Sequence, residues 1–304
     1  MRTAPRLLVT VLGSLVVAVT ATASANDLPH RDDFSMNSIS GGDFRDYVSN
    51  AVMEEDGWAK SMRTLGILHN HMHELMSELA RHAAEEREDD HVPEFDIRIS
   101  GGEWSEYRER LEDAEDESTW RAVVQIAEIM HDRVHHAMYS AVLYDSETRG
   151  RNLNLDDYIG DRAPYEQADT IPSRDGLDMD YASSDVFRSL VWDYSFEGER
   201  LNAAMQKATV FDTLLEDVMT QWAQYAAATM DDEACQPPAF GARMDGEFWA
   251  EYARRVEDCG NGYWRDLVRV TELMHDRVHH MLYTIMLNDA ELHEREDAIE
   301  RMLN

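Results

Sequence analysis

Apolar residues recur at intervals of three and four along much of the chain, which is the spacing of one face of an α-helix. Four long stretches carry this pattern: 60–86, 119–143, 204–230 and 263–287. Shorter patterns at 103–113 and 247–257 predict short helices in the loops that join them. The stretches 42–57 and 184–199 are interpreted as short helices or helix extensions. The pattern therefore predicts an all-α fold.

The second half of the chain repeats the first. Segments 120–143 and 264–287 share 13 of 24 positions without a gap, including a run of seven identical residues, MHDRVHH. The similarity extends backwards, because 101–113 matches 245–258 with one inserted residue. Self-similarity at a fixed spacing is the signature of a repeated structural unit.

Two repeat units, 40–143 and 183–287, are predicted from this similarity. One hairpin of two helices cannot bury its apolar stripes alone. We therefore expect one four-helix bundle, made of two repeated helical hairpins and joined by a long acidic crossover, 144–182. Residues 26–39 are predicted to be disordered, and 288–304 to form a C-terminal helical tail.

The beginning of the chain has the pattern of an export signal. A charged start with Arg2 and Arg6 precedes an apolar run, Leu7–Val19, and a small-x-small cleavage site that ends at Ala25. Residues 1–25 are therefore predicted to be a signal peptide, and the product a periplasmic or secreted bacterial protein. No later stretch approaches the ~20 apolar residues of a transmembrane helix, so no membrane anchor is expected.

Charge and cysteine content narrow the classes of partner. The chain has 61 acidic and 28 basic residues, a formal net charge of −33, so a nucleic-acid or anionic-lipid partner would be repelled. We interpret the acidic excess as a solvated surface suited to salty surroundings, and nothing identifies a protein partner. Cys235 and Cys259 are expected to form a disulfide in an oxidising compartment.

Metal-ligand side chains recur on all four predicted long helices. The candidate ligands are His69, His73, Glu128, His131, His135, Asp212, Glu216, Glu272, His275 and His279. On each helix they are spaced three or four residues apart, so they share one face, on the flank of the apolar stripe. Buried imidazoles and carboxylates are costly unless they are paired or metal-bound. We therefore expect a transition metal, or a pair of metals, bound by residues of both repeats.

The Glu-x-x-His spacing of Glu128 with His131, and of Glu272 with His275, resembles that of the di-iron or di-manganese carboxylate bundles. Ferritin-like bundles also have the predicted connectivity. The resemblance implies a site for dioxygen or peroxide, with these four residues as ligands and iron as the first choice of metal. Copper, manganese and zinc stay open, because one helix offers two imidazoles where that family has a glutamate. Haem is not favoured.

Three functions remain open from the sequence. A metalloenzyme would activate dioxygen, peroxide or water, whereas a non-catalytic metal-handling protein would sense, buffer or carry the ion. The alternative is a structural or partner-binding bundle with a buried network of histidines and carboxylates. Asp132 and Asp276 are expected beside the ligands or on the helix surface, with orientation of a neighbouring imidazole as a further option. His136 and His280 are expected at the surface or beside the ligands, and His82 in solvent.

Overall fold

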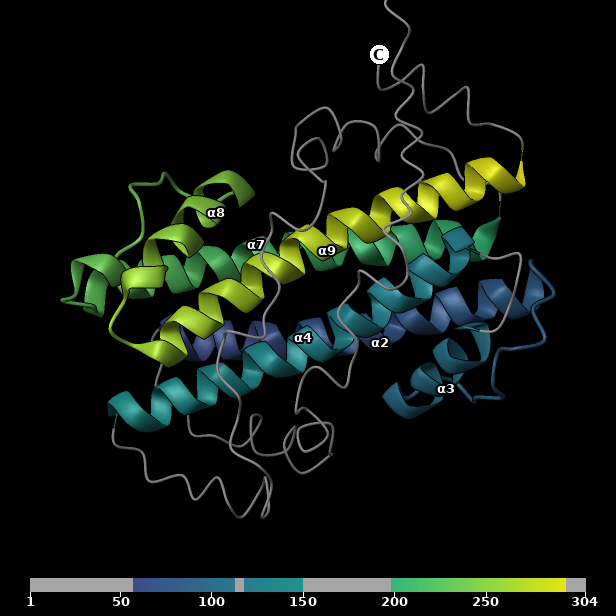
Figure 1. Ribbon diagram of the computed structural model, residues 1–304, viewed down its shortest axis with the longest axis horizontal. Helices are drawn as coiled ribbons and strands as arrows, with labels where there is room; N and C mark the ends of the chain where they lie inside the picture. The colour runs from purple at the N-terminus through teal and green to yellow at the C-terminus, as the bar shows by residue number, and fades with distance from the viewer. Residues whose placement is uncertain (1–56, 113–117, 150–197, 294–304) are drawn as a thin grey trace, which may run out of the picture.

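The structure, a computed structural model, describes residues 57–112, 118–149 and 198–293. Within these ranges the chain forms helices and no strand (Figure 1). The α-helices are α2 (Gly57–Glu85), α3 (Gly101–Glu112), α4 (Ser118–Arg149), α7 (Glu199–Thr229), α8 (Gly246–Arg255) and α9 (Gly262–Leu292). Two 3-10 turns, η5 (Glu233–Cys235) and η6 (Val256–Asp258), flank α8. The prediction of an all-α fold is confirmed for this part of the chain.

Helices α4 and α9 begin one residue before their predicted starts and extend further at their C-terminal ends, whereas α2 and α7 begin three and five residues early and end one residue early. Helix α4 continues to Arg149, past the end expected at residue 143, and α9 continues to Leu292. The predicted signal peptide, the segment 26–39 and most of the crossover 144–182 lie outside the described residues. None of the described helices is long and apolar enough to cross a membrane.

Each of the four long helices packs against two others. Helix α2 contacts α7 and α4, and α9 contacts α4 and α7 (Figure 1). Their apolar stripes are fully buried in the shared core, for example Leu65 of α2, Val134 of α4, Phe211 of α7 and Val278 of α9. Burial of these stripes supplies the main stabilisation, about 25 cal/mol per Å² of apolar surface removed from water.

Buried tryptophans join each short helix to the long helix that follows it. Trp104 Nε1 of α3 donates a hydrogen bond to Val124 O of α4 over 3.1 Å. At the corresponding place in the second half, Trp249 Nε1 of α8 donates to Val268 O of α9 over 3.2 Å. A buried indole N–H needs such an acceptor, so these bonds fix α3 on α4 and α8 on α9 in the same way.

The predicted disulfide is confirmed. Cys235 and Cys259 are bonded, with their Cα atoms 4.9 Å apart, and both side chains are buried. The bond joins η5 to the residue that follows η6, and so closes the segment that contains α8.

Candidate metal centre

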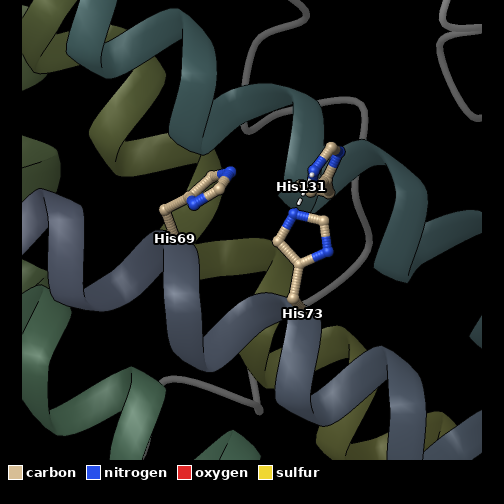
Figure 2. Close-up of side chains that lie close together, drawn as sticks. All are labelled: His69, His73 and His131. Carbon is tan, nitrogen blue, oxygen red and sulfur yellow. Dashed lines mark hydrogen bonds between the residues drawn. The ribbon is translucent and has the colours of Figure 1, made fainter. Parts of the chain in front are cut away.

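Four histidines from α2 and α4 bring their Nε2 atoms together. His69 and His73 lie one turn apart on α2, and His131 and His135 one turn apart on α4. Nε2 of His69 lies 3.1 Å from that of His135, and Nε2 of His131 lies 3.2 Å from those of His73 and His135. Figure 2 shows three of the rings turned toward one another from the two helices. We call these residues the four-histidine group.

Hydrogen bonds between the rings cannot satisfy all three contacts. A neutral imidazole has one proton, so each Nε2 is either one donor or one acceptor, aimed in the plane of its ring. The Nε2 atoms of His131 and His135 each face two others, but each can form a hydrogen bond with only one of them. At most two of the three contacts can therefore be hydrogen bonds. An ion at the centre would instead accept one lone pair from each ring.

The spacing of the nitrogens suits a four-coordinate metal ion. With metal–nitrogen bonds of 2.0–2.1 Å, a tetrahedral arrangement places its nitrogens about 3.3–3.4 Å apart. The three Nε2–Nε2 separations in the group, 3.1 to 3.2 Å, are close to this value. The ligand atoms of His69, His73 and His131 all lie within 4.8 Å of one another. These three side chains therefore need little rearrangement to surround one ion, and His135 joins them through the contacts of its Nε2 with His69 and His131.

A backbone acceptor fixes how His73 presents its ring. His73 Nδ1 lies 3.1 Å from Ile99 O, and because a carbonyl only accepts, Nδ1 donates and Nε2 keeps its lone pair for the group. Ile99 is held in turn by Ser77 of α2, whose hydroxyl accepts from Ile99 N over 3.1 Å. Metal-binding histidines characteristically have such a partner on the other nitrogen.

The first residue of α3 lies directly against the four-histidine group. The helix starts there because Ser100 and Glu103 form a capping box, in which each side chain bonds the other residue's backbone N–H. This places Gly101 so close to His131 that a Cβ on Gly101 would lie 2.8 Å from Cε1 of the ring. Only glycine leaves the ring its present position.

A second, smaller group joins α7 and α9. Asp212 of α7 has its Oδ1 atom 3.2 Å from His279 Nε2 and 3.9 Å from His275 Nε2, both of α9. The two imidazole rings have their centroids 4.4 Å apart. We call these three residues the Asp212 group. In the repeat alignment, Asp212 corresponds to His69, and the two histidines correspond to His131 and His135.

The structure thus divides the predicted ligands between two groups, where the sequence led us to expect one centre fed by four helices. Each group lies between the two long helices of one half of the chain. The helical pattern placed all these residues on the flank of an apolar stripe. In the structure that flank faces the partner helix of the same half and the start of α3 or α8, not the ligands of the other half.

Three predicted carboxylate ligands belong to neither group. Glu128 is buried, and its two oxygens contact Ser105 Oγ at 2.7 Å and Arg108 Nε at 2.5 Å. Glu216 is also buried and lies 2.9 Å from a guanidinium nitrogen of Arg243. Glu272 lies on α9 outside the Asp212 group. The Glu-x-x-His pairs are therefore not assembled as the resemblance implied. Glu128 of the first pair and Glu216 of α7 bind arginine instead.

The polar residues next to the ligands are more deeply buried than expected. Asp132 and Asp276 are both buried, and Asp132 Oδ1 lies 3.5 Å from His131 Nδ1, on the side where an orienting carboxylate is expected. His136 and His280 are buried as well, so a surface position is wrong for both. Burial lowers the pKa of His136 well below its usual value and that of His280 to about 4, and a neighbouring arginine adds to each effect.

His82 is also buried, contrary to the expectation of a solvated ring. Its side chain is 3% exposed and Nδ1 lies 2.9 Å from Glu86 Oε2. Burial lowers the pKa of His82, and the bond to Glu86 opposes that shift. The apolar spacing along 60–86 did not reveal this burial, because His82 is covered by Trp120 of α4.

Sequence reasoning missed the residues that position the rings. Gly101, Ile99 and Ser77 carry no metal-ligand chemistry, and their effect depends on a loop that returns to α2. A usable signal was present in the Ser-x-x-Glu capping box around the glycine pair at 101–102. No protein-family model, curated protein or solved structure matches this chain.

Proposed function

We propose that this protein is an exported metal-binding four-helix bundle, built from two repeated hairpins, that holds one late transition-metal ion in the four-histidine group. The observation that carries the proposal is the convergence of four Nε2 atoms, with more contacts than the imidazole protons can bridge. The bond from His73 Nδ1 to Ile99 O supports it, since it leaves Nε2 available for a metal.

The ligand set favours copper or zinc over iron. Iron was the first choice because of the carboxylates, but the four-histidine group contains none within the described residues. Imidazole nitrogens suit zinc and copper, and divalent copper is the strongest binder of the first-row series. Nitrogens spaced for a tetrahedron also agree with zinc. We therefore propose that the bound ion is copper or zinc.

A shell of four protein ligands favours holding the ion over reacting at it. Catalytic metal sites usually keep one position for water or substrate, whereas four protein ligands fill a tetrahedral shell. His69, His131 and His135 are buried, and His73 is half-buried. One edge of the group is therefore closer to solvent, as an ion that must enter and leave requires. We propose metal handling, as a carrier, buffer or sensor, as the function of this group.

The test is metal binding by the mature protein purified without an affinity tag or chelator. Zinc and copper content are measured as purified, and affinities by competition with a chromophoric chelator. Substitutions His69→Gln and His135→Gln each remove one ligand. Each should weaken metal binding by more than about 100-fold, which is the largest effect expected for a residue that only orients a ligand. His71→Gln is the matched control, because it lies between the two ligands of α2 and outside the group.

The control should bind as the unmodified protein does. Equal affinity of all four proteins, or no uptake by a protein that folds normally, would refute metal binding by this group. The second outcome would leave a structural bundle with a buried histidine network, the alternative that the sequence left open.

A further inference from the structure

We propose that the Asp212 group is a second metal site, with a coordination position open to water or a small anion. It goes beyond the proposed function, which concerns the four-histidine group alone. Its ligands are Asp212, His275 and His279, contributed by α7 and α9. The chain would therefore carry two unlike metal sites, one closed and one open.

Three ligand atoms converge on one point. The Oδ1 atom of Asp212 faces both imidazole Nε2 atoms, at 3.2 Å from His279 and 3.9 Å from His275. A hydrogen bond would account for the shorter distance. It would not account for the longer one, since a bond of 3.9 Å is outside hydrogen-bond range. Both histidines are buried, so contact with water does not explain the orientation of their rings.

The surroundings repeat those of the four-histidine group. Gly246, the first residue of α8, lies against the His275 ring so closely that a Cβ there would overlap Cε1. The helix starts at this point because Asp245 caps it, accepting from Phe248 N over 3.1 Å. Thr220 accepts from Met244 N over 2.9 Å, as Ser77 does from Ile99 N in the first half.

The two groups differ at the fourth position. Where the first group has His73, the second has Glu216, and its carboxylate binds Arg243 at 2.9 Å. Arg243 is fixed there because it also donates to Thr213 O over 2.8 Å. Among the described residues, the Asp212 group therefore offers three ligands. Three protein ligands leave a position that exchangeable water occupies.

This donor set selects a different ion from the first. Two imidazoles and one carboxylate with open positions suit a divalent ion such as iron, manganese, cobalt or zinc. The open position takes water, or a small anion that displaces it. The carboxylate also lowers the charge of the bound ion, which a shell of four neutral imidazoles does not do.

Cobalt(II) and azide together test the proposal in the full mature chain. Cobalt(II) has visible bands that report its coordination, and azide is a small anion that can replace bound water. We expect two cobalt ions per chain, and azide should change the spectrum of one of them. His131→Gln should remove one ion and keep the azide response. Asp212→Asn and His279→Gln should remove the other ion together with that response.

Glu199→Gln is the matched control, because Glu199 lies on the same helix, is exposed and is outside the group. It should keep two ions and the azide response. One cobalt ion per chain that only His131→Gln removes would overturn the second site while leaving the proposed function intact. Two ions with no azide response would overturn the open position. If the unmodified protein binds one cobalt ion and only Asp212→Asn or His279→Gln removes it, the result counts against the proposed function instead.

Discussion

At the scale of single residues, the close approach of a backbone to an imidazole decides how well the ligands are held. A Cβ at Gly101 would lie 2.8 Å from His131 Cε1 and would displace the ring. Gly101→Ala should therefore weaken metal binding by about 10- to 100-fold, the range seen when a residue that orients a ligand is changed. Competition with a chromophoric chelator measures this.

Gly102 provides the control for that substitution. A Cβ there meets only the Ser100 hydroxyl oxygen, at 4.0 Å. Gly102→Ala should leave metal affinity unchanged, and by helix propensity it should not destabilise α3. If both alanine variants bind metal equally well, the ring of His131 does not need its present position.

Substitution of Glu128 tests whether this carboxylate is a metal ligand or a structural group. It is buried, and its oxygens contact Arg108 and Ser105. Glu128→Gln leaves a buried guanidinium without its counter-charge, which costs about 3–5 kcal/mol in the free energy of unfolding. Metal stoichiometry should not change. Denaturant unfolding and metal analysis together check this, with the exposed Glu106→Gln, which also loses an arginine partner, as control.

At the scale of helices, the loop before α3 links two positions of α2 through hydrogen bonds. Ser77 of α2 holds Ile99 N, and Ile99 O in turn accepts from His73 Nδ1. Ser77→Ala should release the loop, costing about 1–3 kcal/mol for the unpaired N–H, and should also weaken metal binding. Thr64→Ala on the same helix removes an exposed hydroxyl bonded only locally, and should do neither. Unchanged affinity in Ser77→Ala would show that the bond to Ile99 does not hold His73.

The helices and the candidate ligands could be predicted from the sequence, but their grouping could not. Periodicity identifies the apolar face, and duplication of MHDRVHH identifies corresponding positions. Periodicity does not show which neighbour a flank faces. His131 and His275 therefore looked like members of one centre, whereas each faces the helix of its own half and a glycine that starts a short helix. Arg108, which binds Glu128, has alanine at the corresponding place in the second half, so its role was not marked by repetition.

At the scale of the whole molecule, the buried histidines and the acidic surface act in opposite directions as pH falls. The folded chain holds His280 neutral, with its pKa lowered to about 4, whereas an unfolded chain protonates it near 6.5. Between these values the unfolded state binds more protons, so stability is present above about 6.5 and is lost toward pH 4. His136 contributes in the same direction. Carboxylates take up protons mainly below pH 5, and only there does the loss of negative charge relieve repulsion.

The metal-free protein should therefore lose thermal stability between pH 6.5 and 5, before the acidic surface is neutralised. Complete titration of His280 would cost about 3 kcal/mol, at 1.36 kcal/mol per pKa unit. Calorimetry of the metal-free chain at several pH values checks this. His280→Asn should flatten the slope in that window, because no group at that position then charges on unfolding. A slope equal in the two proteins would assign the acid sensitivity to groups other than His280.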